Sequence, residues 1–442
     1  MVLTDGEHYP SVTRDAIAEL QSTRDYQVLA AVFIGGTEKI SSDSDFASLG
    51  VPVVRGGNYL QSIREAIKKY NPDEVLDLSD EPIIGYRERF EIASHVLANG
   101  AAYRGADFLF SPPRFTARVT RPSISIIGTG KRIGKTAVGG FVARTLAEKH
   151  NPLVVTMGRG GPAEPEFLNS AETKITPEYL LSVSKQGRHA SSDYFEDLLT
   201  ARVTTIGCRR CGGGMSGQTF VSNVPRGAQL SEQIEADLVI FEGSGSSIPP
   251  VETEGRILVI GANQPLDYMR LYLGPYRILI SDLIILTMCE PPLADQAKID
   301  AMGAAIKEIN PNCTLVNTVF RPKPLGDIKG KRVLLTLTAP AVMLKTISAY
   351  LESTYQCRVV GASPHLSNRP LLKEDLERFG RLQPEVVLSE LKAAAVDVVT
   401  AWGLEKGLEV VYLDNEPIPT DPNVDLKAEV LRFSEKLNLP SN

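Results

Sequence analysis

Residues 123–136 read Ser-Ile-Ser-Ile-Ile-Gly-Thr-Gly-Lys-Arg-Ile-Gly-Lys-Thr, and a helical pattern follows over residues 137–146. The apolar run at 124–127 is typical of a buried strand, so the glycine-rich stretch after it joins a strand to a helix. Such a turn points backbone N–H groups and the positive end of the helix dipole at phosphate groups. It therefore predicts a phosphate-binding loop, one residue longer than the common pattern because Thr129 stands where the first glycine is expected.

The loop predicts a role for its residues in binding ATP and Mg²⁺. Lys135 would reach the β- and γ-phosphates, and the Thr136 hydroxyl would hold Mg²⁺. Glu242 follows the apolar stretch 237–241, and an acid at the end of a strand beside such a loop can bind Mg²⁺. The alternative is a glutamate that faces solvent. The expected nucleotide-binding residues are Gly128, Thr129, Gly130, Lys131, Arg132, Ile133, Gly134, Lys135 and Thr136.

The composition favours a large globular enzyme. The chain has 442 residues, of which 43% are hydrophobic and 23% charged. Its net charge of −6 argues against a nucleic-acid-binding surface, which is normally basic. No apolar stretch approaches the ~20 residues of a membrane span, and the N-terminus lacks the basic start and apolar run of a secretion signal. We expect a cytoplasmic protein that binds neither nucleic acid nor membrane.

Strand and helix patterns alternate along the chain and predict an α/β fold. The alternation begins before the phosphate loop, and the proline- and arginine-rich stretch 111–122 indicates a domain boundary. We expect a small α/β domain over residues 1–120 and a P-loop NTPase domain with a mostly parallel sheet over residues 121–442. From about residue 332 the alternation continues as an α/β extension, and the sequence leaves open whether it forms a separate lobe or extends the central sheet.

Arginines and glycines concentrate in two segments that follow the loop. In Met-Gly-Arg-Gly-Gly-Pro at 157–162, Arg159 can neutralise charge on a transferring phosphoryl group. The stretch 198–231 contains four arginines, many glycines and no Asp or Glu. This combination predicts an anion cradle, with a basic surface loop as the alternative. The candidate substrate-binding residues are Arg188, His189, Arg209, Arg210, Gly213 and Gly214, while Ser191 to Asp193 resemble a helix cap.

Two further motifs bear on the choice of ligand. Asn317 follows the strand pattern at 314–316, where such folds often place a base-reading residue, and the Asn-Lys-x-Asp pattern associated with guanine is missing. We therefore expect adenine, with Asn317 reading its polar edge. Cys208 and Cys211 have the spacing of a metal site, but structural zinc needs two more ligands and no second such pair exists.

These motifs resemble two known families. The longer loop at 128–136, the strand end Glu242-Gly243-Ser244-Gly245 and Asn317 resemble the dethiobiotin-synthetase branch of the P-loop enzymes. Over nearly the full length, the leading domain, the loop, the segment 157–162 and the stretch 208–217 resemble the cyclic 2,3-diphosphoglycerate synthetase family. That resemblance implies an ATP-dependent ligase that closes 2,3-diphosphoglycerate into its cyclic anhydride and releases ADP and phosphate. It also implies a cytoplasmic homodimer.

Two other classes of function stay open on the sequence. One is an ATP-dependent ligase for a carboxylate or carbamate, whose substrate would need fewer positive charges than 198–231 supplies. The other is a nucleotide-driven switch or metallochaperone, in which Cys208 and Cys211 hold a metal. For the cyclising enzyme, the candidate catalytic residues are Lys135, Arg159 and Glu242, and the candidate Mg²⁺ ligands are Thr136 and Glu242. The attacking phosphate oxygen is already ionised, so no general base is expected.

Overall fold

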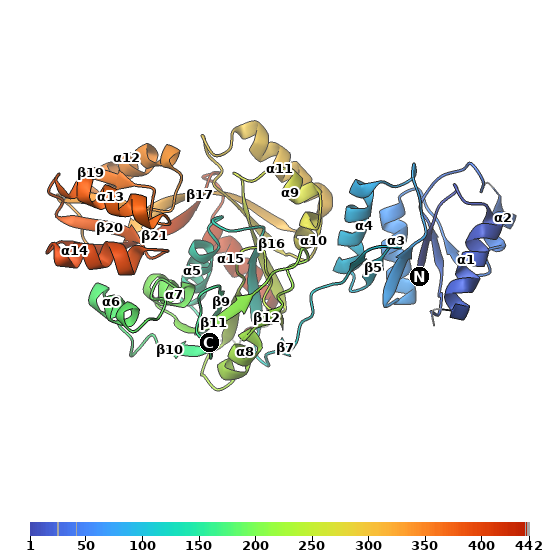
Figure 1. Cartoon of the computed structure of the whole chain (residues 1–442), viewed down its shortest axis with the longest axis horizontal. Helices are drawn as coiled ribbons and strands as arrows, with labels where there is room; N and C mark the ends of the chain where they lie inside the picture. Colours follow the sequence, from blue (N-terminus) through green and yellow to red (C-terminus); the bar gives the residue numbers. More distant parts are fainter. Residues whose placement is uncertain (24–25, 41, 438, 440–442) are drawn as a thin grey trace. The chain divides into compact units, whose positions relative to one another are not determined.

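The computed structural model describes residues 1–23, 26–40, 42–437 and 439. The chain forms two compact units (Figure 1). The first comprises Met1–Arg114 together with Pro265–Ile280 and Ala304–Pro311, and the second comprises the remainder. The sequence did not predict that the two later segments pack with the N-terminal residues. The expected boundary at residue 120 stays a prediction.

The first unit contains a six-stranded sheet in the order β3-β2-β1-β4-β5-β6, parallel except for the β5–β6 pair. This agrees with the expected small α/β domain, although β1, β3 and β5 were not predicted from the sequence. The strands are β1 (Val2–Thr4), β2 (Ala31–Phe33), β3 (Val53–Val54), β4 (Glu74–Asp77), β5 (Ala102–Arg104) and β6 (Leu109–Phe110). The helices are α1 (Pro10–Thr23), α2 (Asp43–Ala47), α3 (Tyr59–Tyr70), α4 (Tyr86–Ala98), α9 (Asp267–Arg270) and α10 (Gly274–Leu279).

The second unit is built on a 13-stranded sheet. In sheet order its main strands are β10 (Glu166–Leu168), β11 (Thr204–Cys211), β9 (Pro152–Gly158), β13 (Leu238–Glu242), β8 (Ser123–Gly128), β15 (Gly255–Gly261), β16 (Leu283–Thr287), β17 (Thr314–Pro324), β21 (Glu409–Pro419), β20 (Val386–Glu390), β18 (Arg332–Thr336) and β19 (Arg358–Ser363). Short β12 (Val221–Ser222) pairs with β11, and β7 (Ala117–Arg118) pairs with β14 (Val251–Glu252) in a separate two-stranded sheet.

Helices flank this sheet and also carry site residues (Figure 1). They are α5 (Lys135–Leu146), α6 (Pro177–Lys185), α7 (Asp193–Ala201), α8 (Val224–Ser231), α12 (Leu344–Tyr355), α13 (Arg369–Gly380), α14 (Ala401–Glu405) and α15 (Leu426–Ser434), with the short helical segments η1 (Ala341–Met343), η2 (Ala395–Thr400) and η3 (Glu435–Leu437). Helix α11 (Gln296–Ile309) begins in this unit, and its residues from Ala304 onward belong to the first. The α/β fold with mostly parallel sheets is the one that the sequence predicted.

Strand β17 decides the open question of the C-terminal extension. Its residues 314–317 pair in parallel with β16, whereas residues 318–324 pair antiparallel with β21. The strand therefore belongs to both halves of the sheet, and the C-terminal residues extend the central sheet. Neither β20 nor β21 was predicted from the sequence. The pairing of β21 with β17 joins segments that lie far apart in the chain.

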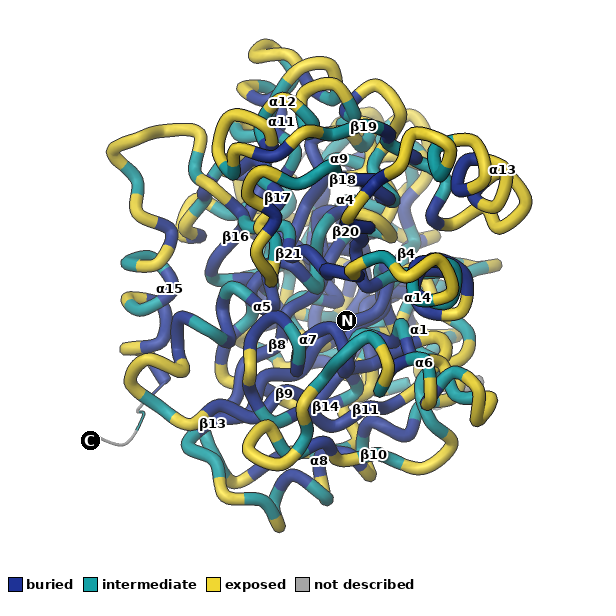
Figure 2. The backbone as a smooth tube through the Cα atoms, turned by 90° about the vertical axis from the view of Figure 1, so that its left-hand side faces the viewer, coloured by how far each residue is buried: buried dark blue, intermediate teal, exposed yellow. Residues whose placement is uncertain are grey.

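The centre of the sheet is buried and positions the phosphate loop. All residues of β8, β9 and β13 are buried, as Figure 2 shows by the dark tube along these strands. Side chains of β8 and α5, including Ile124, Val138 and Val142, share one apolar core. Because the carboxyl ends of neighbouring parallel strands lie at one edge of a sheet, the loops after these three strands meet there.

Candidate active site

The phosphate loop has the predicted position between β8 and α5. The Lys135 Nζ donates to the Gly130 carbonyl oxygen at 2.8 Å, so the lysine folds back over its own loop. The Thr287 hydroxyl of β16 donates to the Ile133 carbonyl oxygen at 2.8 Å and anchors the loop to the sheet. Burial lowers the pKa of Lys135 to about 8, although the negative charges of Asp193 and Glu242 act to raise this pKa. The site thus holds a desolvated cation that would gain from an anionic ligand.

Two features favour glycine at position 134, directly before α5: its backbone conformation and the close packing of an aromatic ring. Its φ of +86° lies in the left-handed region, which favours glycine. A Cβ at this position would lie 2.1 Å from Cζ of Phe320 in β17. The glycine therefore allows the loop to turn into the helix while an aromatic ring packs directly on it.

Glu242 ends β13 at the carboxyl edge of the sheet, where the sequence placed a Mg²⁺ ligand. It is 4% exposed, which contradicts the alternative of a glutamate facing solvent. Its Oε1 has no hydrogen-bond partner within the described part of the chain. Burial, with the charges of Asp193 and Glu196, raises the pKa of Glu242 well above its ordinary value. A buried carboxylate oxygen without a partner fits a bound cation.

Two further elements bring charged side chains close to Glu242, which the sequence did not predict. Helix α7 contributes Glu196 and Asp197, which are both buried, and Lys392 follows β20. Lys392 Nζ lies 3.3 Å from Glu196 Oε1. Burial acts to lower the pKa of Lys392, but the carboxylates of Glu196 and Glu390 raise it above its ordinary value. The C-terminal part of the sheet therefore supplies a second lysine near the phosphate loop.

Two arginines approach each other beside the loop after β13. A Cβ on Gly245 would lie 2.4 Å from Arg159 Nη2 and 3.3 Å from Arg210 Nη2. Arg210 donates to the carbonyl oxygens of Ser244 at 2.8 Å and Gly212 at 3.1 Å, while its buried Nε has no partner among the described residues. Burial, and then the charge of Arg159, lower the pKa of Arg210. Arg210 is thus held by two carbonyl oxygens next to the Arg159 guanidinium, and two adjacent guanidinium groups suit an anionic ligand.

Arg209 lies differently from its neighbour. Both residues are in β11, which the sequence did not predict as a strand, and successive side chains of a strand point to opposite faces. Arg209 is exposed, and its backbone N–H donates to Asn223 Oδ1 at 2.6 Å. The structure therefore joins Arg210 to Arg159 and leaves Arg209 on the other face. The substrate-binding role of Arg209 stays a prediction.

The remaining predicted substrate residues lie in different surroundings. His189 packs on the Arg159 segment, since a Cβ on Gly160 would lie 3.1 Å from its Cδ2. A Cβ on Gly213 would lie 3.3 Å from Arg210 Nη1, and the Gly214 N–H donates to Gln218 O at 2.8 Å. Arg188 is already engaged, because its guanidinium pairs with Glu166. Ser192 occupies the N-cap position of α7, but its hydroxyl donates to the His189 carbonyl oxygen at 2.6 Å and makes no capping hydrogen bond to the helix.

Asn317 lies at the point where β17 leaves β16 and begins to pair with β21. Its side-chain Oδ1 is buried and has no hydrogen-bond partner within residues that the structure describes. This oxygen could accept a hydrogen bond from the exocyclic amine of adenine. The predicted role in reading the base is therefore compatible with its surroundings, and it stays a prediction.

The two cysteines do not form a metal centre among the described residues. Cys208 packs in the core, and burial raises the pKa of its thiol to about 12, whereas Cys211 is exposed. No group of three or more His, Cys, Asp or Glu within the described ranges could hold a metal ion. None of the helices in this part of the chain combines the length and apolar character needed to cross a bilayer.

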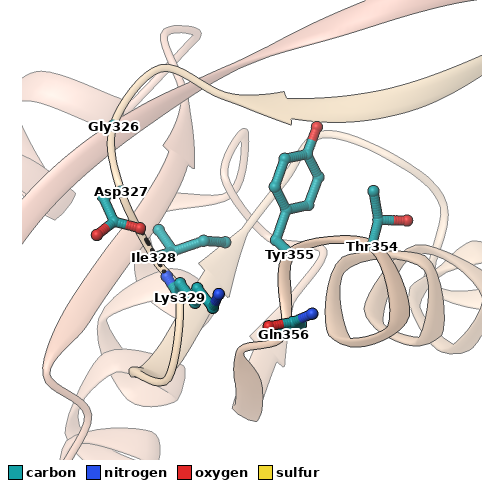
Figure 3. A pocket seen from close by; sticks show the side chains of 7 residues that line it. All are labelled: Gly326, Asp327, Ile328, Lys329, Thr354, Tyr355 and Gln356. Atoms are coloured by element: carbon teal, nitrogen blue, oxygen red, sulfur yellow. Dashed lines mark hydrogen bonds between the residues drawn. The ribbon is translucent and has the colours of Figure 1, made fainter.

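One pocket lies in the C-terminal part of the chain (Figure 3). It is lined by Gly326, Asp327, Ile328, Lys329, Thr354, Tyr355 and Gln356. The Lys329 N–H donates to Asp327 Oδ1 at 3.0 Å, so the aspartate is used within its own turn. No residue that we expected to bind nucleotide or substrate is part of this lining.

Comparison with protein families matches most of the chain in three sections. Models of the N-terminal, P-loop and C-terminal domains of cyclic 2,3-diphosphoglycerate synthetase match residues 1–111, 123–319 and 324–416. The P-loop match contains the phosphate loop, Glu242 and Asn317. The C-terminal match contains Lys392.

Curated relatives and solved structures are also similar to the chain. Proteins named cyclic 2,3-diphosphoglycerate synthetase from Methanothermus fervidus and Thermococcus kodakarensis are 51% and 50% identical over 95% and 99% of this chain and 93% and 98% of the relative. LpxK from Aquifex aeolicus is 12% identical with a TM-score of 0.44, covering 79% of this chain and 96% of that one. The three matched sections and the identity over nearly the full length show that the chain belongs to the cyclic 2,3-diphosphoglycerate synthetase family.

Proposed function

We propose that this protein uses ATP to close 2,3-diphosphoglycerate into cyclic 2,3-diphosphoglycerate, with release of ADP and phosphate. The observation that carries the proposal is the pairing of Arg159 with Arg210 beside the phosphate loop. A substrate with two phosphate groups needs positive charge in addition to that which binds the nucleotide. The substrate of a carboxylate ligase would need fewer positive charges than these two arginines supply, so the arrangement favours the cyclising reaction over that alternative.

The reaction consists of two displacements. In the first, an oxygen of one substrate phosphate forms a bond to the γ-phosphorus of ATP, and the bond from that phosphorus to ADP breaks. In the second, an oxygen of the other substrate phosphate bonds to the activated substrate phosphorus, and inorganic phosphate leaves. Both displacements bring anions together, so electrostatic repulsion is a large part of the barrier.

The positively charged side chains are divided between the two ligands, ATP and the substrate. Lys135 and the N–H groups at the start of α5 would bind the β- and γ-phosphates of ATP. Arg159 and Arg210 would hold the substrate phosphates, and each guanidinium offers several donors in a fixed plane. Positioning both phosphates of one molecule makes the second displacement intramolecular, which lowers its entropic cost.

Thr136 and Glu242 would hold Mg²⁺ at the nucleotide. The buried Glu242 Oε1, which has no partner within the described residues, is the feature that fits a cation. When bound, Mg²⁺ supplies positive charge to the phosphate oxygens and orients them. The protein is further proposed to work in the cytoplasm as a homodimer, as the family resemblance implies.

The test is to incubate the protein with ATP, Mg²⁺ and 2,3-diphosphoglycerate and to follow phosphorus NMR. We expect a new anhydride resonance together with ADP and phosphate. Lys135→Ala should abolish this signal while the circular dichroism spectrum stays that of a folded protein. ADP release without the anhydride resonance would contradict the proposal, and full activity of Lys135→Ala would contradict the loop assignment.

A further inference from the structure

Asp197 is a buried acid for which the proposed reaction gives no role. The residue is 1% exposed, and neither of its carboxylate oxygens has a hydrogen-bond partner among the residues that the structure describes. It differs in this from Asp414 in β21, a buried aspartate whose Oδ2 lies 2.8 Å from Arg144 Nη1. Ionised carboxylates are costly to bury without a compensating charge. Asp197 therefore requires a cation or a proton that the described side chains do not provide by direct contact.

The packing of α7 on α5 places Asp197 next to the metal-binding side of the phosphate loop. Thr200 faces Gly140 of α5, where a Cβ would lie 3.1 Å from the Thr200 Oγ1. Residues three apart in a helix share a face, so Asp197 also points toward α5 one turn nearer the start of α7. On α5, the adjacent Gly139 faces Glu242, since a Cβ there would lie 1.6 Å from Glu242 Oε1.

The electrostatic surroundings agree with this placement. Burial, and then the charge of Glu242, raise the pKa of Asp197 well above its ordinary value. Glu196, one residue earlier, has Lys392 as a partner at 3.3 Å. The pair that lacks a directly bonded cation is thus Asp197 and Glu242.

We propose that Asp197 and Glu242 together bind a divalent cation, so that helix α7 supplies a second carboxylate to the Mg²⁺ site of the phosphate loop. The inference rests on the proposed function, because this cation site is the Mg²⁺ site proposed there. Mg²⁺ is usually held by one or two carboxylates, with water and phosphate oxygens completing six ligands.

The experiment titrates the nucleotide-free full chain with Mn²⁺ and measures free Mn²⁺ by electron paramagnetic resonance. We expect one Mn²⁺ per chain, displaced by Mg²⁺. Asp197→Asn and Glu242→Gln should each weaken this binding at least tenfold, because each removes a charged ligand. The matched control is Asp414→Asn, which alters a buried aspartate that already has an arginine partner and should change the Mn²⁺ affinity less than twofold.

Each outcome decides the inference. Unchanged Mn²⁺ affinity in Asp197→Asn, or no Mn²⁺ binding by the wild-type chain, would overturn it and leave Asp197 as a protonated acid. If Asp197→Asn does not fold, Asp197→Glu keeps the charge and should still weaken Mn²⁺ binding, because the longer side chain displaces the carboxylate. The titration contains neither ATP nor 2,3-diphosphoglycerate. Failure to form the cyclic product would therefore contradict the proposed function without affecting this result.

Discussion

Glu242 fills the space beside Gly139 of α5, where a Cβ would lie 1.6 Å from Glu242 Oε1. Glycine in a helix interior is usually unfavourable by roughly 0.8–1.0 kcal/mol relative to alanine. At this position it leaves room for the buried acid at the end of β13. The next residue, Gly140, is less confined, since a Cβ there would lie 3.1 Å from Thr200 Oγ1. The two glycines therefore offer a matched pair of variants.

Gly139→Ala should reduce both stability and turnover. The added methyl group must displace Glu242 or the helix, and such overpacking typically costs about 1–3 kcal/mol. We expect a lower midpoint in urea unfolding and at least a tenfold loss of ATP-dependent turnover, measured as ADP release. Gly140→Ala should keep most of both quantities. Equal behaviour of the two variants would mean that the contact with Glu242 is not what restricts position 139.

Arg210→Ala should weaken substrate binding more than nucleotide binding. Its guanidinium lies with that of Arg159 beside Gly245, so its loss removes charge from the position assigned to the substrate phosphates. We expect KM for 2,3-diphosphoglycerate to rise at least tenfold, while the Kd for ADP, from calorimetry, changes less than threefold. Arg209→Ala is the comparison variant and should raise this KM less, because that side chain is on the opposite face of β11. A larger effect of Arg209→Ala would reverse the assignment.

Asn317→Leu should diminish the preference for adenine. The Asn317 Oδ1 is buried without a described partner, and it can accept from the exocyclic amine of adenine, which inosine lacks. The wild-type protein should favour ATP over inosine triphosphate in kcat/KM, and the variant should lose most of that discrimination. A similar ratio in both proteins would show that Asn317 does not read the base.

His95 in α4 should make stability depend on pH between about 4 and 6.5. Burial, and secondarily Arg64, lower the pKa of His95 to about 4, and its Nδ1 has no partner in the described part of the chain. The unfolded chain, with a pKa near 6.5, then binds more protons than the folded one within this window. The free energy of unfolding therefore falls as pH decreases from 6.5 toward 4, by at most ~3 kcal/mol from this group.

The measurement for His95 compares urea unfolding of the wild-type protein and His95→Gln at several pH values. The difference between the two should be constant above pH 7 and should change as pH decreases, since only the wild-type protein carries the buried imidazole. A difference that stays constant down to pH 4 would show that His95 is not held in its neutral form.

The sequence predicted those parts of the site that are local in the chain. The phosphate loop is recognisable because strand, glycines, lysine and helix follow one another within a short stretch, and Glu242 because an acid follows an apolar strand. Lys392 and Asp197 gave no such signal. Their proximity depends on the packing of α7 and on the return of β21 to β17, which no local pattern encodes.

The arginines of β11 are a second example of an arrangement that the sequence could not predict. Arg209 and Arg210 are adjacent in sequence and were expected to act together on the substrate. Because β11 continues through them, the alternation of side chains along a strand separates them. The partner of Arg210 is instead Arg159, which follows a neighbouring strand. Composition predicted an anion-binding region, which stays a prediction, and only strand register decides which of its charged side chains lie together.

Strand β17 has a consequence for any attempt to dissect the protein. Its residues 318–324 exchange backbone hydrogen bonds with β21, so a chain that ended before residue 409 would leave those peptide groups as an open sheet edge. Such edges invite pairing with other molecules and aggregation. The same strand carries Asn317 and Phe320, so movement of the C-terminal residues would be transmitted to the nucleotide side through shared peptide bonds.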